Sequence, residues 1–245
     1  MMIKPNTLEI LYEDIHMIAV NKAAGVLSIP DRFNPDISNL ITQLKKLYPE
    51  VLPVHRLDKY TTGINLFAKD ADSHAALSAI FESREIEKYY DAIVDGSPQP
   101  ESGRIDVPLA ESTVTRGKML AHQRGKPSTT DYKIIKSYRN FAHVYLRIFT
   151  GRMHQIRVHM QYIGNPLIVD TLYGNRNAFF LSEIKHKKFN LGKNDEERPL
   201  LTRQPLHASK LIFNHPVNNE KIEIQAMLPK DMQAVLTQMD KWIKV

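Results

Sequence analysis

The segment from Thr129 to Thr150 constrains the fold more than any other part of the sequence. It reads TTDYKIIKSYRNFAHVYLRIFT, two alternating apolar and polar runs separated by a short polar turn. In the second run Val144, Leu146 and Ile148 would share one face of a strand, because successive side chains of a strand point to opposite sides. The pattern predicts an antiparallel hairpin with one face in a core.

The same alternation recurs along the chain. Further hairpins are predicted over 8–22 and 206–228, single strands over 64–70 and 86–96, and helices over 39–48, 73–85, 154–166 and 229–242. Because strands outnumber helices and hairpins dominate, we expect the α+β class, with a mainly antiparallel, twisted, mixed sheet flanked by helices and loops.

The chain of 245 residues is expected to form a single domain over 1–245. Charged residues are dense between 175 and 203, which predicts a surface insertion there. Such a segment is either a solvated loop or a region that contacts RNA, and the sequence does not favour one over the other.

Composition narrows the partners and the compartment. The formal net charge of +6 suits a polyanion, and nucleic acid is favoured over a membrane because no long basic amphipathic helix is present. The absence of cysteine excludes disulfides and thiolate metal sites, as expected of a reducing compartment. The first 14 residues lack a charged head and an apolar leader segment, so we expect a cytoplasmic protein.

Several common chemistries lack their sequence motifs. The chain has neither a phosphate-binding P-loop nor a dinucleotide-binding glycine motif. His154 and His159 are five residues apart, which is poor spacing for one metal on a helix. Ser73 and Ser128 lack a nucleophile elbow. We therefore expect no metal and no cofactor.

Two polar motifs about a hundred residues apart carry a family resemblance. VHRLDKYTTG resembles the H-R-L-D-x-x-T-S-G signature of the RluA family of pseudouridine synthases, and GRMHQIRVH resembles their G-R-x-H-Q-[IL]-R-V-H motif. VNKAAGVLSIP, KYYDAIVDG and LHASKLIFNHP resemble three further segments of that family, in the same order. The departures include Ala23 in place of the usual proline and Val169 in place of a glycine.

The resemblance implies the pseudouridine synthase fold without an S4 domain, and it implies a set of catalytic residues. Asp58 would be the essential acid, Arg157 its charged partner, and Tyr90 the ring that stacks on the uracil. A single carboxylate suits the reaction, because the base is moved from N1 to C5 and nothing is hydrolysed, whereas glycoside hydrolysis usually needs two carboxyl groups. Burial disfavours a charged carboxylate, and a nearby guanidinium restores the charge.

The family also implies substrate-binding residues and a substrate. Arg56 would fill the space left by a flipped nucleotide, and His55, Ile156 and Thr62 would line the site. We expect a monomer that acts on structured large-subunit ribosomal RNA, transfer RNA or both. Two alternatives remain, a non-catalytic RNA-binding or ribosome-assembly module on the same fold and, with less support, a nucleoside glycosidase.

Overall fold

The computed structural model describes residues 8–31, 33–34, 36–186, 189–190, 192 and 196–245. The chain divides into two compact units, each described by itself below. The first unit comprises Met1–Lys88 with Ala208–Met227, and the second comprises Tyr89–His207 with Leu228–Val245. The expected single domain over 1–245 stays a prediction. The start of the predicted leader-free N-terminus, residues 1–7, lies outside the described residues, as do parts of the predicted insertion.

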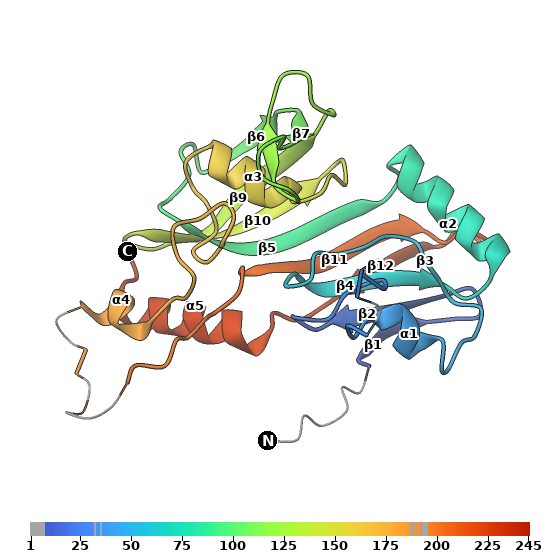
Figure 1. The fold of residues 1–245 in the computed structure, drawn as a ribbon, viewed down its shortest axis with the longest axis horizontal. Coiled ribbons are helices and arrows are strands. Elements are labelled where there is room, and N and C mark those ends of the chain that lie inside the picture. The colour runs from blue at the N-terminus through green and yellow to red at the C-terminus, as the bar shows by residue number, and fades with distance from the viewer. Residues whose placement is uncertain (1–7, 32, 35, 187–188, 191, 193–195) are drawn as a thin grey trace. The chain divides into compact units, whose positions relative to one another are not determined.

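The first unit is a sheet with two helices. Its strands run in the order β1-β2-β4-β11, with β3 on β4 and β12 on β11 (Figure 1). The elements are β1 (Ile10–Glu13), β2 (Met17–Lys22), α1 (Leu40–Leu44), β3 (Leu52–Pro53), β4 (Thr62–Ala68), α2 (Ala71–Ser83), most of β11 (Leu206–Asn214) and β12 (Lys221–Gln225). The pairs β1–β2 and β11–β12 are antiparallel, so both predicted hairpins are confirmed.

Polar caps fix where the two helices begin. The side chain of Asn39 accepts the backbone N–H of Thr42 at 2.9 Å, and Asp70 accepts that of Ser73 at 2.7 Å. Such caps satisfy N–H groups that have no partner inside the helix. The core of the unit is built from apolar side chains of the strands and of α2, among them Met17, Ile64, Leu66, Leu77, Leu211 and Phe213.

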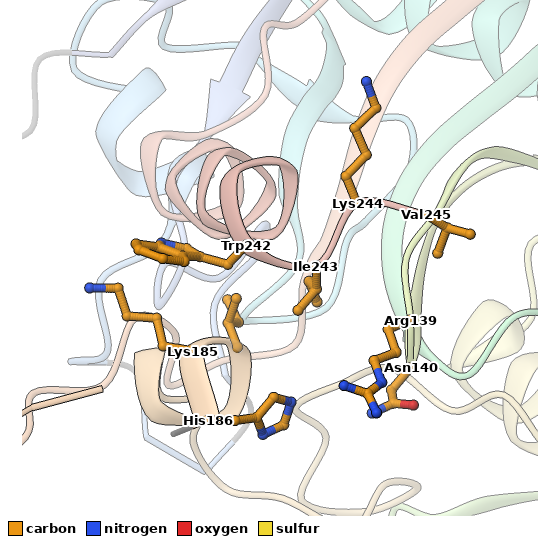
Figure 2. A pocket seen from close by; sticks show the side chains of 9 residues that line it. Arg139, Asn140, Lys185, His186, Trp242, Ile243, Lys244 and Val245 are labelled. Carbon is orange, nitrogen blue, oxygen red and sulfur yellow. The ribbon is translucent and has the colours of Figure 1, made fainter. Parts of the chain in front are cut away.

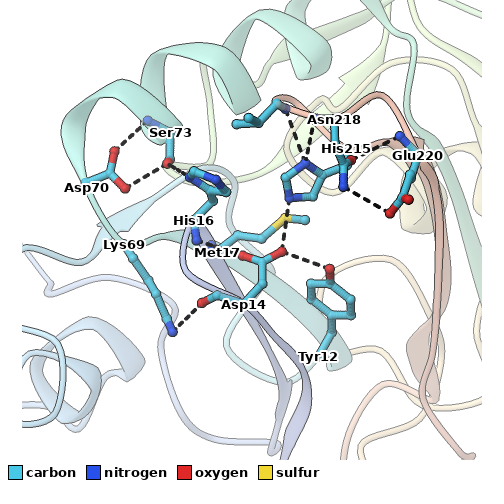
Figure 3. A network of polar contacts seen from close by, with 11 residues as sticks. Tyr12, Asp14, His16, Met17, Lys69, Asp70, Ser73, His215, Asn218 and Glu220 are labelled. Atoms are coloured by element: carbon cyan, nitrogen blue, oxygen red, sulfur yellow. Dashed lines mark hydrogen bonds and ion pairs between the residues drawn. The ribbon is translucent and has the colours of Figure 1, made fainter.

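A half-buried polar network joins the two hairpin turns of the first unit (Figure 3). Asp14 accepts the hydroxyl of Tyr12 at 2.8 Å and the backbone N–H of His16 and Met17 at 2.7 and 2.8 Å. It also accepts Nε2–H of His215 at 3.0 Å. Burial opposes ionisation of Asp14, but these donors outweigh it and hold the pKa of its carboxyl below the usual value.

The second unit has its own strands in the order β5-β10-β9-β6. Its elements are β5 (Glu87–Asp95, from Tyr89 onward), β6 (Ser102–Asp106), β7 (Leu109–Glu111), β8 (Met119–Ala121), β9 (Thr129–Ser137), β10 (Phe141–Ile148), α3 (Gln155–Tyr162), α4 (Leu181–Lys185) and α5 (Lys230–Trp242). Strands β9 and β10 pair antiparallel, with Val144 opposite Ile134, which confirms the predicted hairpin. Val144, Leu146 and Ile148 are buried as expected.

The core of the second unit includes side chains from the segment 175–203, for which a surface insertion stays a prediction. Phe179, Ile184 and Leu201 all fall within 175–203, yet each is buried in the cluster that α5 covers with Met232 and Val235. Helices α4 and α5 lie side by side in this unit (Figure 1). Both ends of the segment therefore belong to the core.

Antiparallel strand pairs with a few helices confirm the predicted α+β class. Among the described residues, none of the helices has the length and apolar character that crossing a membrane would require.

Candidate functional site

The loop that carries HRLD, residues 55–58, precedes β4 and is anchored to this strand by His55. Its Nε2 accepts the backbone N–H of Leu66 at 3.0 Å, and its carbonyl accepts the side-chain amide of Asn65 at 3.2 Å. The imidazole stacks on Phe81 with ring centroids 4.9 Å apart. Burial, with a smaller contribution from Lys88, lowers the pKa of His55 to about 3. The ring is therefore neutral at pH 7, as a nitrogen that accepts an N–H must be.

A second anchor comes from the segment VNKAAGVLSIP. Lys22 is fully buried, and its ammonium donates to the carbonyls of Val26 at 2.7 Å, Lys59 at 2.9 Å and Ala23 at 3.1 Å. Ser28 Oγ accepts the N–H of Leu57 at 2.9 Å and donates to its carbonyl at 3.3 Å. The sequence alone assigns no role to Lys22 or Ser28, although both lie in the segment VNKAAGVLSIP.

Asp58 lies between these anchors and is half-buried. Its carbonyl accepts the N–H of Thr61 at 3.1 Å, which closes a turn. Arg56 is exposed, and Thr62 is buried as the first residue of β4. Gly63 follows with φ +106°, and a Cβ at this position would overlap the backbone of Ala208. The structure thus places His55, Arg56, Asp58 and Thr62 in one segment of the first unit, which His55 and Lys22 anchor.

Three other predicted residues lie in the second unit. Tyr90 and Tyr89 are neighbours on β5, and their side chains point to opposite faces, as expected. Tyr90 is buried, with 8% of its surface exposed. Tyr89 instead stacks on Tyr145 with centroids 5.3 Å apart and an interplanar angle of 10°. Ile156 is buried in α3.

Arg157, one residue further along α3, is held by a buried acid. Its Nε and Nη2 donate to the two oxygens of Asp170 at 2.7 and 2.8 Å, and the Asp170 side chain is 0% exposed. The backbone N–H groups of Leu172 and Tyr173 donate to the same carboxylate at 3.0 and 3.1 Å. Burial alone would raise the pKa of Asp170, but Arg157 and these N–H groups lower it below its usual value.

Sequence reasoning missed Asp170 as the partner of Arg157. The signal that could have found it is the acid in VDTLYG, the segment that follows the helix. This bidentate arrangement fixes the plane of the guanidinium, which Lys in the same place could not do.

Gln155 fixes the start of α3. Its Oε1 accepts the hydroxyl of Thr150 at 2.7 Å and the N–H of Arg152 at 3.1 Å. Its amide donates to the Thr129 carbonyl and to Thr130 Oγ1, both at 3.0 Å. A buried side chain with this many partners sets the position of the helix that carries Ile156 and Arg157.

A metal site is not built from the residues that the structure describes, since no group of three histidine or acidic side chains is placed to hold an ion there. His159 lies between Thr130 Oγ1 and the Val107 carbonyl, each at 2.9 Å, so both of its ring nitrogens are used within the fold.

Residues 16–162 match the family model described as RNA pseudouridylate synthase. The chain belongs to this family. The pseudouridine synthase D of the large ribosomal subunit from Yersinia pestis is 37% identical over 234 residues, which are 92% of this chain and 68% of that protein. The dual-specificity RNA pseudouridine synthase RluA of Vibrio vulnificus is 38% identical over 214 residues, 85% of this chain and 78% of that protein.

Solved structures agree with this assignment. Human RNA pseudouridylate synthase domain containing 4 superposes with a TM-score of 0.71 at 25% identity, covering 97% of this chain and 94% of that one. The RluA-family resemblance is confirmed, and the chain is an RNA pseudouridine synthase, an isomerase that converts uridine in RNA to pseudouridine.

Proposed function

We propose that this pseudouridine synthase modifies large-subunit ribosomal RNA and that Asp58 carries the bond exchange between C1′–N1 and C1′–C5. The observation that supports Asp58 most directly is the fixing of its loop by buried groups on both sides. His55 holds one end against β4, and Lys22 holds the other through the Lys59 carbonyl. An acid that must meet one sugar carbon gains from a loop that is ordered before substrate arrives.

Tyr90 and Arg157 complete the proposed catalytic set. Tyr90 is a buried ring on β5, suited to stack on an unstacked uracil. Arg157 offers a guanidinium whose orientation Asp170 fixes through two of its five N–H donors. The pairing of Arg157 with Asp58 stays a prediction.

Substrate binding is proposed for the remaining predicted residues. Arg56 is exposed and can enter a stack of bases, while Thr62 and Ile156 supply buried, compact side chains. His55 contributes through loop position, because its neutral ring is already used as an acceptor within the unit.

The proposed RNA substrate is based on the names of the similar proteins. Several of them are named as large-subunit ribosomal synthases, which supports ribosomal RNA as the substrate. The relative named as dual-specific supports a second RNA, for which we propose transfer RNA. We extend the proposal to a monomer in the cytoplasm; the absence of cysteine fits a reducing compartment.

The test measures tritium release from RNA labelled at uridine C5, because isomerisation frees that hydrogen. Asp58→Ala and Asp58→Asn should abolish release while RNA affinity changes less than about threefold, a shift below about 1 kcal/mol. Asp72→Ala removes an exposed acid of α2 in the same unit and should release tritium at the wild-type rate. Substantial residual release by both Asp58 variants would refute the assignment.

A second experiment distinguishes the enzyme from a non-catalytic RNA-binding module. Total RNA from a strain that lacks the gene is incubated with wild-type protein, and new pseudouridines are mapped by carbodiimide modification and primer extension. Tight RNA binding with no new pseudouridine would favour the module. Free uracil in the supernatant would favour a glycosidase.

A further inference from the structure

A pocket of about 660 Å³ lies within the second unit, and none of its lining residues belongs to α3. It is formed by the turn between β9 and β10, the end of α4 and the C-terminal end of α5 (Figure 2). Ile184 and Ile243 are buried members of the core and give the pocket an apolar floor. Its volume is within the range of pockets that bind small organic ligands.

The walls of this pocket are basic. Arg139, Lys185, His186 and Lys244 line it, and none of the nine described residues in its lining is an aspartate or glutamate. None of these four side chains makes a hydrogen bond or ion pair with another residue in the described part of the chain. The acid Asp240 on α5 accepts Lys136 at 2.6 Å and the Tyr138 hydroxyl at 2.8 Å, and Lys244 also helps to lower the pKa of its carboxyl.

Trp242 forms one wall of the pocket, and its indole ring contacts two lysines and Gln238. The ammonium of Lys185 lies 4.6 Å from the centre of the indole ring, and that of Lys241 lies 5.3 Å from it. The indole N–H donates to Gln238 at 3.3 Å. A cation held over an aromatic face loses less freedom when it meets an anion, so Lys185 is partly ordered in advance.

The ordinary explanation for exposed cations is solvation. It does not account well for three permanent positive charges around one concavity whose lining holds no aspartate or glutamate side chain, because like charges repel and a cleft lined mainly by one sign concentrates the field. The arrangement suits a polyanion with tetrahedral groups. Arg139 can bind a phosphate through its planar fork, and the lysines add point charges.

We propose that this pocket binds backbone phosphates of the RNA substrate other than those of the uridine that is isomerised. The inference rests on the proposed function in taking RNA as the ligand. Under this proposal, the pocket contributes to the affinity of RNA binding and to its salt dependence. It also favours long RNAs over short ones, and it takes no part in the isomerisation. The pocket would engage an arm of a folded RNA that a short stem-loop lacks.

The experiment compares two variants that remove equal charge. The pocket variant is Arg139→Gln, Lys185→Gln and Lys244→Gln together. The control is Lys45→Gln, Lys46→Gln and Lys230→Gln, three exposed lysines outside the pocket. Binding of a long ribosomal RNA fragment is measured between 0.05 and 0.3 M salt, and tritium release is measured on that fragment and on a short stem-loop.

Loss of two phosphate contacts should reduce the slope of log Kd against log salt by about 1.4 to 1.8, and weaken binding at 0.15 M salt by about 10- to 30-fold. The control should change the slope by less than half as much. Release from the short stem-loop should stay within about twofold of wild type for both variants. Circular dichroism spectra establish that both variants are folded.

An equal slope and equal affinity for the pocket variant and the control would overturn the proposal. If wild-type protein released no tritium from any RNA, the proposed function would fail, but the binding comparison would still decide whether the pocket holds phosphate. Crosslinking of the RNA fragment to a peptide that contains His186 or Trp242 would support the proposal independently of the variants. Crosslinks confined to other peptides would count against it.

Discussion

Asp170→Asn is expected to lower the free energy of unfolding of the second unit by about 3 to 5 kcal/mol, the cost of removing one partner from a buried ion pair. The carboxylate is fully buried and accepts four N–H groups, two of them from Arg157. Asparagine keeps the size but loses the charge, and its amide would face an N–H donor. The Arg157 guanidinium, itself 6% exposed, would lose the carboxylate that accepts two of its N–H groups.

Urea denaturation followed by tryptophan fluorescence suits this measurement. Trp242 is the only tryptophan of the chain and lies in the second unit, so the signal reports on the unit that carries the substitution. With a denaturant slope of about 2 to 3 kcal/mol per molar, the midpoint should fall by about 1 to 2.5 M.

Asp231→Asn is the matched control. Arg203 forms the same bidentate pair with Asp231 through its Nε and Nη2, each at 2.7 Å, but the Asp231 side chain is 36% exposed. Water can replace much of that interaction, so we expect a cost of about 1 kcal/mol. If Asp231→Asn proved as costly as Asp170→Asn, the argument from burial would be refuted.

The pH dependence gives a second measurement on the same pair. Because the pKa of Asp170 is lowered in the folded state, its contribution is fully present above the unfolded value of about 3.9 and is lost as pH falls through the folded value. The stability difference between wild type and Asp170→Asn should be constant from pH 5 to 8 and close below pH 4. A stability difference that increased below pH 5 would contradict an ionised Asp170 paired with Arg157.

Three further substitutions test the loop of Asp58 and the turn network. Lys22→Met should leave three backbone carbonyls without their donor, lower stability by about 3 kcal/mol or more and reduce tritium release, and unchanged release would show that the ammonium does not order the loop. His55→Gln should reduce the loss of stability between pH 6.5 and 5 by at most about 2 kcal/mol, because unfolded histidine takes up a proton there while the folded ring, with a pKa of about 3, does not. An unchanged pH slope would mean that His55 protonates in the folded protein. His215→Ala removes the donor to Asp14 and should cost about 1 to 3 kcal/mol in urea denaturation, whereas exposed His122→Ala should cost less than about 0.5 kcal/mol.

The hairpins could be predicted because their information is local. Alternation over β9 and β10, together with a short turn, leaves only one register that buries Val144 and Leu146. Strands β6 to β8 were not predicted, because they are only three to five residues long and lack a sustained alternation. Their pairing depends on neighbours that are distant in the sequence.

The candidate site divides in the same way. The motif residues could be assigned because a family pattern named them, but their supports could not. A lysine is rarely buried, so nothing in the local sequence distinguishes Lys22 from a solvated residue. Asp170 follows a helix in a segment that reads as an ordinary turn, and only the fold brings it to Arg157, thirteen positions earlier.

Because Lys22 binds backbone carbonyl oxygens, the amino-acid sequence of the turns around it can change without loss of its hydrogen bonds. Every amino acid supplies the same oxygen, so substitutions at the gripped positions leave the attachment intact as long as the chain path is kept. Ala23, for example, accepts the ammonium through its backbone carbonyl at 3.1 Å, and this contact does not depend on its side chain. Substitutions at the positions whose carbonyls bind Lys22 should therefore leave the position of Asp58 unchanged. Replacement of Lys22 itself would remove all three contacts.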